Sequence, residues 1–297
     1  TAVVLTFSCP SYFGGVMLGR MPPLTIKRKD SLVKAVRRTA TRQLAAVIDS
    51  LTGPKPSPSS ARRELLRMQS LLHLIRRPLT GEVFNREHRA VLRGLKALPD
   101  ASATQRELLI ELAAVEPAME VSALLDMIES ETDPPRTPRK KTGPDPKRLR
   151  LVADLAEMRM RARYWHLPDG GFELLAPGLR QSYQRAATRR GPDTSPAEFA
   201  AALGRFADQL QALERVWPDM LITTRKAARR LQQHAQRRAD LAALRPQVQE
   251  HAALLTRLDE RAEQTHAATL PLREQLFVET PAAFTKRLGG WWDAWRT

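Results

Sequence analysis

Apolar residues recur along most of this chain at intervals of three and four positions, the period of an α-helix with one buried face. No segment alternates between apolar and polar residues as a strand does. The pattern therefore predicts an all-α helical bundle. The expected helices cover residues 30–51, 60–78, 82–97, 103–115, 118–131, 147–165, 173–191, 196–216, 218–239, 244–264 and 281–297.

The last of these helices should begin at Pro281, with Thr280 as its N-cap, because Thr and Pro are favoured at those two positions. It carries Trp291, Trp292 and Trp295 at helical spacing. Three tryptophans could form an aromatic binding platform. The regular spacing instead favours docking of this helix on the core.

Two short segments, GPKPSP at 53–58 and GPDTSP at 191–196, lie 138 positions apart and share Gly, Pro, Ser and Pro at the same positions. The helix predicted after each segment has an apolar stripe with steps of 3, 4, 3 and 4. The two stripes match in register, position by position: Leu65, Met68, Leu72, Ile75 and Leu79 against Leu203, Phe206, Leu210, Leu213 and Trp217. This agreement predicts an internal duplication, that is, two related helical halves. Two unrelated helices with similar loops are the alternative.

Composition divides the chain further. Residues 133–147 are rich in proline and charge and are expected to link a first helical half, 25–132, to a second, 148–297. Residues 1–24 read as an N-terminal extension. Their apolar start carries no basic residues of the kind that open a signal peptide, so a cytoplasmic protein is expected and export is the alternative.

The formal net charge is +16, with 48 basic against 32 acidic residues. Residues 27–77 hold 13 basic and three acidic residues, a net charge of +10, whereas residues 101–132 carry a net charge of −6. Such an excess, segregated along the chain, indicates a polyanion partner: nucleic acid, polyphosphate or an anionic membrane surface. A solvated basic surface without a ligand is the simpler alternative.

The sequence lacks the motifs of common catalytic and cofactor sites. There is no glycine-rich phosphate loop, no HExxH, and one cysteine, Cys9. The six histidines form no cluster in sequence, and no apolar run is long enough to span a membrane. We therefore expect no metal, no cofactor, no membrane insertion and no enzymatic activity.

Basic residues at helical spacing are the remaining candidate site. Residues four apart on a helix are separated by about 6 Å along its axis, so successive guanidinium groups can contact successive phosphates of an extended anion. On the first two predicted helices the candidates are Lys34, Arg37, Arg38, Arg42, Arg62, Arg63 and Arg67. The alternative is that these side chains only solvate their helices.

Several segments, taken in order, resemble the CHAD (conserved histidine α-helical domain) family. They are ARRELLRMQSLLHLIRRPLTGEVFNREHRAVLRGL (61–95), GFELLAPGLRQSYQRA (171–186), QLQALERVWPDML (209–221) and REQLFVETPAAFTKRLGGWWDAWR (273–296). The resemblance implies two pseudo-symmetric helical halves around a basic groove that binds inorganic polyphosphate, and association with polyphosphate granules. Arg38, Arg42, Arg180 and Arg185 match basic positions of the family.

The chain departs from the family at its name-giving positions. Ser59 and Ala197 stand where the histidines are expected, and Ala200 and Ala201 replace a basic pair in the second half. A basic run from Arg225 to Arg230 is not part of the family pattern. Three hypotheses follow. A polyphosphate-binding module is favoured over a degenerate scaffold that binds a protein, and over a nucleic-acid-binding protein.

Overall fold

The computed structural model describes residues 28–98, 108, 145–188 and 195–297. Within these ranges the regular secondary structure is helical and no strand occurs, which confirms the predicted all-α class. The predicted N-terminal extension, the helices 103–115 and 118–131, and nearly all of the linker lie outside the described residues.

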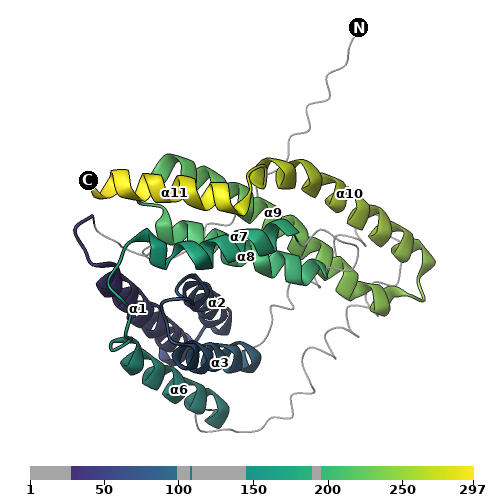
Figure 1. The fold of residues 1–297 in the computed structure, drawn as a ribbon. Helices are drawn as coiled ribbons and strands as arrows, with labels where there is room; N and C mark the ends of the chain where they lie inside the picture. Colours follow the sequence, from purple (N-terminus) through teal and green to yellow (C-terminus); the bar gives the residue numbers. More distant parts are fainter. Residues whose placement is uncertain (1–27, 99–107, 109–144, 189–194) are drawn as a thin grey trace.

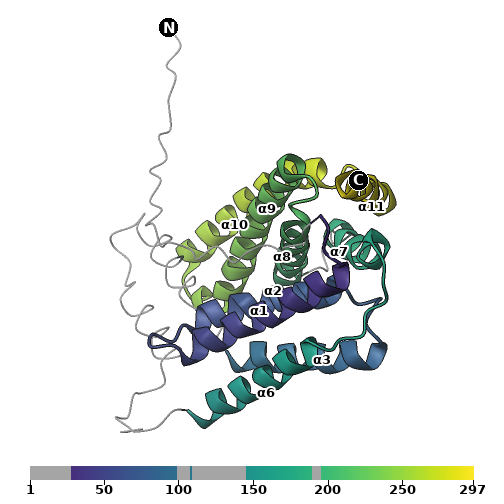
Figure 2. The ribbon, with the colours of Figure 1, turned by 90° about the vertical axis from the view of Figure 1, so that its left-hand side faces the viewer.

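Four helices form one group: α1 (Leu32–Thr52), α2 (Pro58–Leu74), α3 (Gly81–Ala97) and α6 (Pro146–Ala162). α1 packs against α2 and α6, and α3 packs against the same two helices (Figures 1 and 2). Their facing sides are apolar, since the heptad-like positions of each helix, such as Leu44 and Leu65, are fully buried.

A second group comprises the remaining elements: η1 (Phe172–Leu174), α7 (Ala176–Thr188), α8 (Pro196–Leu213), α9 (Pro218–Leu244), η2 (Arg245–Val248), α10 (Ala252–Leu276) and α11 (Pro281–Arg296). α8 packs between α7 and α9, and α9 forms a long hairpin with α10 (Figure 1). α11 packs on α7 and η1, and its Trp292 is buried in the core.

The two groups meet where α2 contacts α7 and α8. Gly178 permits the closest of these approaches, because a Cβ at this position would lie 2.2 Å from the carbonyl oxygen of Leu74. One apolar cluster runs through both groups and includes Met68, Tyr183 and Phe206, each almost fully buried. The groups therefore share a core.

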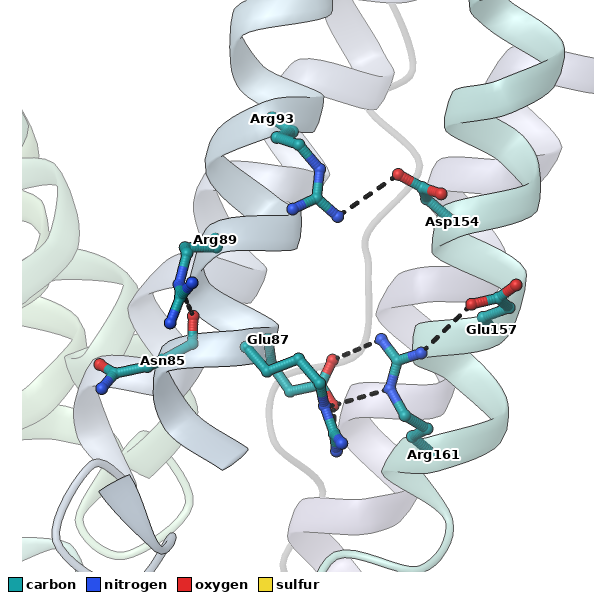
Figure 3. Close-up of polar contacts among 8 residues, drawn as sticks. Asn85, Glu87, Arg89, Arg93, Asp154, Glu157 and Arg161 are labelled. Atoms are coloured by element: carbon teal, nitrogen blue, oxygen red, sulfur yellow. Dashed lines mark hydrogen bonds and ion pairs between the residues drawn. The ribbon is translucent and has the colours of Figure 1, made fainter. Parts of the chain in front are cut away.

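A buried ion pair joins α3 to α6 on the outer side of the first group. Glu87 is 0% exposed, and both its carboxylate oxygens accept hydrogen bonds of 2.9 Å from Arg161 (Figure 3). Arg93 and Asp154 form a second, exposed pair one to two turns away at 3.4 Å. The bidentate geometry at Glu87 fixes how α6 lies on α3.

Helix starts follow the predicted capping chemistry. Thr280 Oγ1 accepts a hydrogen bond of 3.2 Å from the Ala283 amide, and Pro281 opens α11, as predicted. Ser57 caps α2 in the same way, ahead of Pro58. Proline at the first helical position has no amide hydrogen to leave unsatisfied.

Several predicted boundaries were wrong, and prolines explain two of them. α2 ends at Leu74 rather than at residue 78, because a helical Pro78 would clash with the carbonyl of Leu74. The predicted helix 244–264 starts later and ends later, as α10. Pro246 opens the short η2 instead, and α10 continues through Pro271 to Leu276.

Candidate functional site

A cavity of about 1160 Å³ lies at the junction of the two helical groups. Its wall is formed by the turn after α2, by η1 and the start of α7, and by α11. Four cationic side chains line it: Arg76, Arg77, Arg180 and Lys286. They come from three separate parts of the chain, and the fold brings them together.

Local sequence explains the position of each cation. Arg76 and Arg77 follow the end of α2 and precede Pro78, so they lie in the turn that reverses the chain toward α3. Arg180 is on the first turns of α7, two residues after the glycine that lets α7 approach α2. Lys286 lies on the exposed side of α11.

The cavity lining mixes apolar and polar groups and carries both signs of charge. Glu173 and Asp293 also line it, so four cations face two carboxylates. Glu173 is engaged by the backbone, because its Oε1 accepts a hydrogen bond of 2.7 Å from the Gly171 amide. Gln181 and Gln184 add neutral hydrogen-bonding groups. The excess of cations favours an anionic ligand.

Two histidines lie beside the cavity, behind Arg76. His73 on α2 is 8% exposed, and its ring lies edge-on to His88 on α3 at a centroid distance of 5.0 Å. Phe84 stacks on His88 at 5.3 Å, and the Arg76 guanidinium lies over the Phe84 ring, 5.0 Å from its centroid. Arg76 thus lines the cavity and also lies close to the histidine pair.

The electrostatic potential around these two histidines is positive, because arginines surround them. Burial lowers the pKa of His73 to about 3, and the charges of Arg205, His88, Arg185 and Arg76 contribute in the same direction. Burial, Arg205 and Arg76 also lower the pKa of His88. The rings are therefore neutral near pH 7, and the surrounding arginines are the local source of charge.

The structure gives several of the predicted binding residues structural partners. Arg37 donates two hydrogen bonds, of 2.9 and 2.6 Å, to the carbonyl oxygen of Trp165. Arg62 donates to the carbonyls of Leu95 and Leu98 at the end of α3. Both guanidinium groups satisfy backbone oxygens between helices.

Ion pairs and short contacts engage three more predicted residues. Arg38 pairs with Asp30 at 2.8 Å, and Arg67 pairs with Glu64 at 2.7 Å. Arg63 donates to Ser60 Oγ. Within the run 225–230, Arg225 pairs with Glu214 and Arg229 with Asp208, so half of that run holds α9 to α8.

Lys34 and Arg42 are exposed on α1, and Arg185 acts on His73 from α7. Of the nine predicted binding residues, all within the described ranges, Arg180 alone lines the cavity. Sequence reasoning missed Arg76, Arg77 and Lys286. A partial signal existed for the histidines, since a reversal at Pro78 and Leu79 brings residue 73 level with residue 84, one helical turn from His88.

Two other kinds of site find no support in the described ranges. No group of three or more His, Cys, Asp or Glu side chains is arranged to hold a metal ion there. Among those same residues, no helix combines the length and apolarity needed to span a bilayer.

Comparison with known proteins gives no family assignment. No family model matches the chain, and neither a curated protein nor a solved structure matches it at a significant level. The resemblance to the CHAD family therefore stays a prediction from sequence.

Proposed function

We propose that the protein binds inorganic polyphosphate, or a polyanion of similar chemistry, without transforming it. The observation that carries the proposal is the convergence of Arg76, Arg77, Arg180 and Lys286 on one cavity between the two helical groups. Arginine suits this task because its planar fork can bind two phosphate oxygens at once, and lysine adds a mobile positive charge.

The lining favours a phosphate chain over single-stranded nucleic acid. Sites for single strands usually offer aromatic surfaces on which successive bases stack. Among the described lining residues Phe172 is the one aromatic side chain, and it is 7% exposed. A chain of phosphates needs no stacking surface, only cations and hydrogen-bond donors.

We further propose that the two helical groups derive from duplicated halves, as the sequence register predicts, with the difference that α6, expected to open the second half at 148, packs with the first group. Helices α2 and α8 begin at Pro58 and Pro196, which are 138 residues apart. In each group the preceding helix, α1 before α2 and α7 before α8, packs against it. α6 packs on α1 in the first group, and α11 packs on α7 in the second. This arrangement supports a divergent CHAD-like architecture.

The experiment is an equilibrium titration of the purified protein with fluorescently labelled long-chain polyphosphate at several salt concentrations. Because binding releases counterions, the logarithm of affinity should fall linearly with the logarithm of salt concentration. Unlabelled polyphosphate should compete better than RNA or DNA of equal charge. Preferential competition by nucleic acid would favour the nucleic-acid alternative, and the absence of binding to any polyanion would overturn the proposal.

A further inference from the structure

We propose that binding of the polyanion is coupled to proton uptake by His88, with Arg76 as the group that links the cavity to the histidine pair. This inference rests on the proposed function and concerns the regulation of the same site. It would make the affinity for the ligand rise as the pH falls.

The link is geometric. Arg76 lines the cavity, and its guanidinium lies 5.0 Å from the centroid of Phe84. Phe84 in turn stacks on His88 with an interplanar angle of 12°. Arg76 and His88 both contact the Phe84 ring, and the charge of Arg76 acts on His88, so a ligand phosphate that binds Arg76 also changes the electrostatic potential at His88.

His88 is half-buried and faces cations from two directions. Arg76 lies on the turn after α2 and Arg205 on α8, and both disfavour a charged imidazole at position 88. From α2, the His73 ring packs edge-to-face against the His88 ring, and Gln69 Nε2 lies 3.5 Å from Nε2 of His88. On the side of α3 that packs on α6, the neighbouring Glu87 is already paired with Arg161.

An anion in the cavity changes this balance. Burial and Arg205, the larger causes of the lowered pKa of His88, remain, but the negative charge of the ligand offsets that of Arg76, so the pKa of His88 rises when the ligand binds. Linkage is reciprocal: if the ligand favours the protonated ring, protonation favours the ligand. Burial, which the ligand does not relieve, is the largest cause of the lowered pKa of both rings; His73, buried and with a pKa of about 3, is expected to stay neutral, whereas the less buried His88 responds.

The test is calorimetric titration with long-chain polyphosphate in two buffers of different ionisation enthalpy, between about pH 5.5 and 6.5, where a histidine changes charge. The difference between the buffers gives the protons taken up per site. We expect net uptake by the wild-type protein, with affinity rising by up to about tenfold per pH unit at full uptake of one proton. His88→Gln should lose most of the uptake, whereas His166→Gln, which alters an exposed histidine outside the cavity lining, should retain it.

The outcomes separate the two proposals. Tight binding with no proton uptake, or with equal uptake in the wild type and in His88→Gln, overturns the coupling and leaves the binding function intact. Absence of binding overturns the binding function. If His88→Gln does not fold, the ring resonances of His88 in the wild type decide the matter, because the coupling requires its titration midpoint to rise when polyphosphate is added.

Discussion

Ser70 on α2 donates a hydrogen bond of 2.9 Å from its hydroxyl to Oδ2 of Asp208 on α8, and the two residues are 138 positions apart. This is the same separation that relates the two GP-x-x-SP segments. Gln209 adds a bond from its side-chain amide to the Ser70 carbonyl at 3.1 Å. Under the proposed duplication, residues 70 and 208 are equivalent, and equivalent residues touch only near the axis that relates two halves.

Replacing Asp208 with alanine should destabilise the protein by about 2 kcal/mol, because it removes the carboxylate shared by Ser70 and Arg229 and leaves Arg229 without a counterion in a mostly buried interface, with Gln232 as its remaining partner. Urea-induced unfolding followed by circular dichroism measures the change. Asp154→Ala, which removes the exposed pair with Arg93, is the control and should cost less than about 0.5 kcal/mol. Equal losses of stability in the two variants would show that the α2–α8 contact contributes no more to stability than an exposed ion pair does.

Removal of the Arg161 side chain should destabilise the protein more than removal of the Asp208 side chain. Arg161→Ala leaves the fully buried Glu87 carboxylate with Arg86 as its remaining cation, so a loss of about 3 kcal/mol is expected. The double variant Glu87→Leu/Arg161→Met should recover most of it, since apolar residues of similar size need no charge compensation. A double variant no more stable than Arg161→Ala would refute this account of the pair.

Two glycines provide a matched pair of substitutions. At Gly178 an added Cβ would meet the backbone carbonyl oxygens of Leu74 and His73 at 2.2 and 2.5 Å, whereas at Gly290 it would meet nothing within 4 Å. Gly178→Ala should therefore cost at least about 3 kcal/mol, because α7 must move away from α2. Gly290→Ala should stabilise α11 by up to about 1 kcal/mol. Melting temperatures that shift in the same direction for both variants would contradict the packing described.

Acid should weaken the fold through His73. Its pKa is about 3 in the folded protein, against 6.5 as the ordinary value, so the unfolded chain takes up a proton first as the pH falls. The stability associated with the neutral ring is complete above pH 6.5 and declines toward pH 3, by at most about 1.4 kcal/mol per pH unit. His73→Leu should flatten this slope in urea unfolding at a series of pH values. An unchanged slope, or an equal effect of His166→Leu, would exclude His73 as its source.

The sequence predicted the helices well where proline, glycine and apolar period agree, as at Thr280 and Pro281. It failed for the helix expected at 244–264, because Pro246 lies in the short η2 and the helix that follows, α10, runs to Leu276 through Pro271. Periodicity places a residue on a face of its own helix. It does not tell which neighbouring element covers that face.

The candidate site shows the same limit. Arg37 and Arg62 have the spacing of ligand-binding residues, yet each donates to backbone carbonyls of another element. Arg76 and Arg77 belong to no helical stripe, because they lie in a turn, and Lys286 belongs to a separate helix, α11. Their convergence depends on how α7 packs against the end of α2, at Gly178, and on how α11 packs on α7.

The most direct measurement compares two double charge reversals that change the net charge equally. Arg77→Glu/Arg180→Glu alters the cavity, and Lys226→Glu/Arg230→Glu alters exposed residues on α9. In titrations with polyphosphate at one near-physiological salt concentration, the cavity variant should lose at least about 100-fold in affinity and the α9 variant a few-fold at most, because only the first removes charge-assisted bonds to phosphate. Equal losses in the two variants would contradict a ligand seated in the cavity.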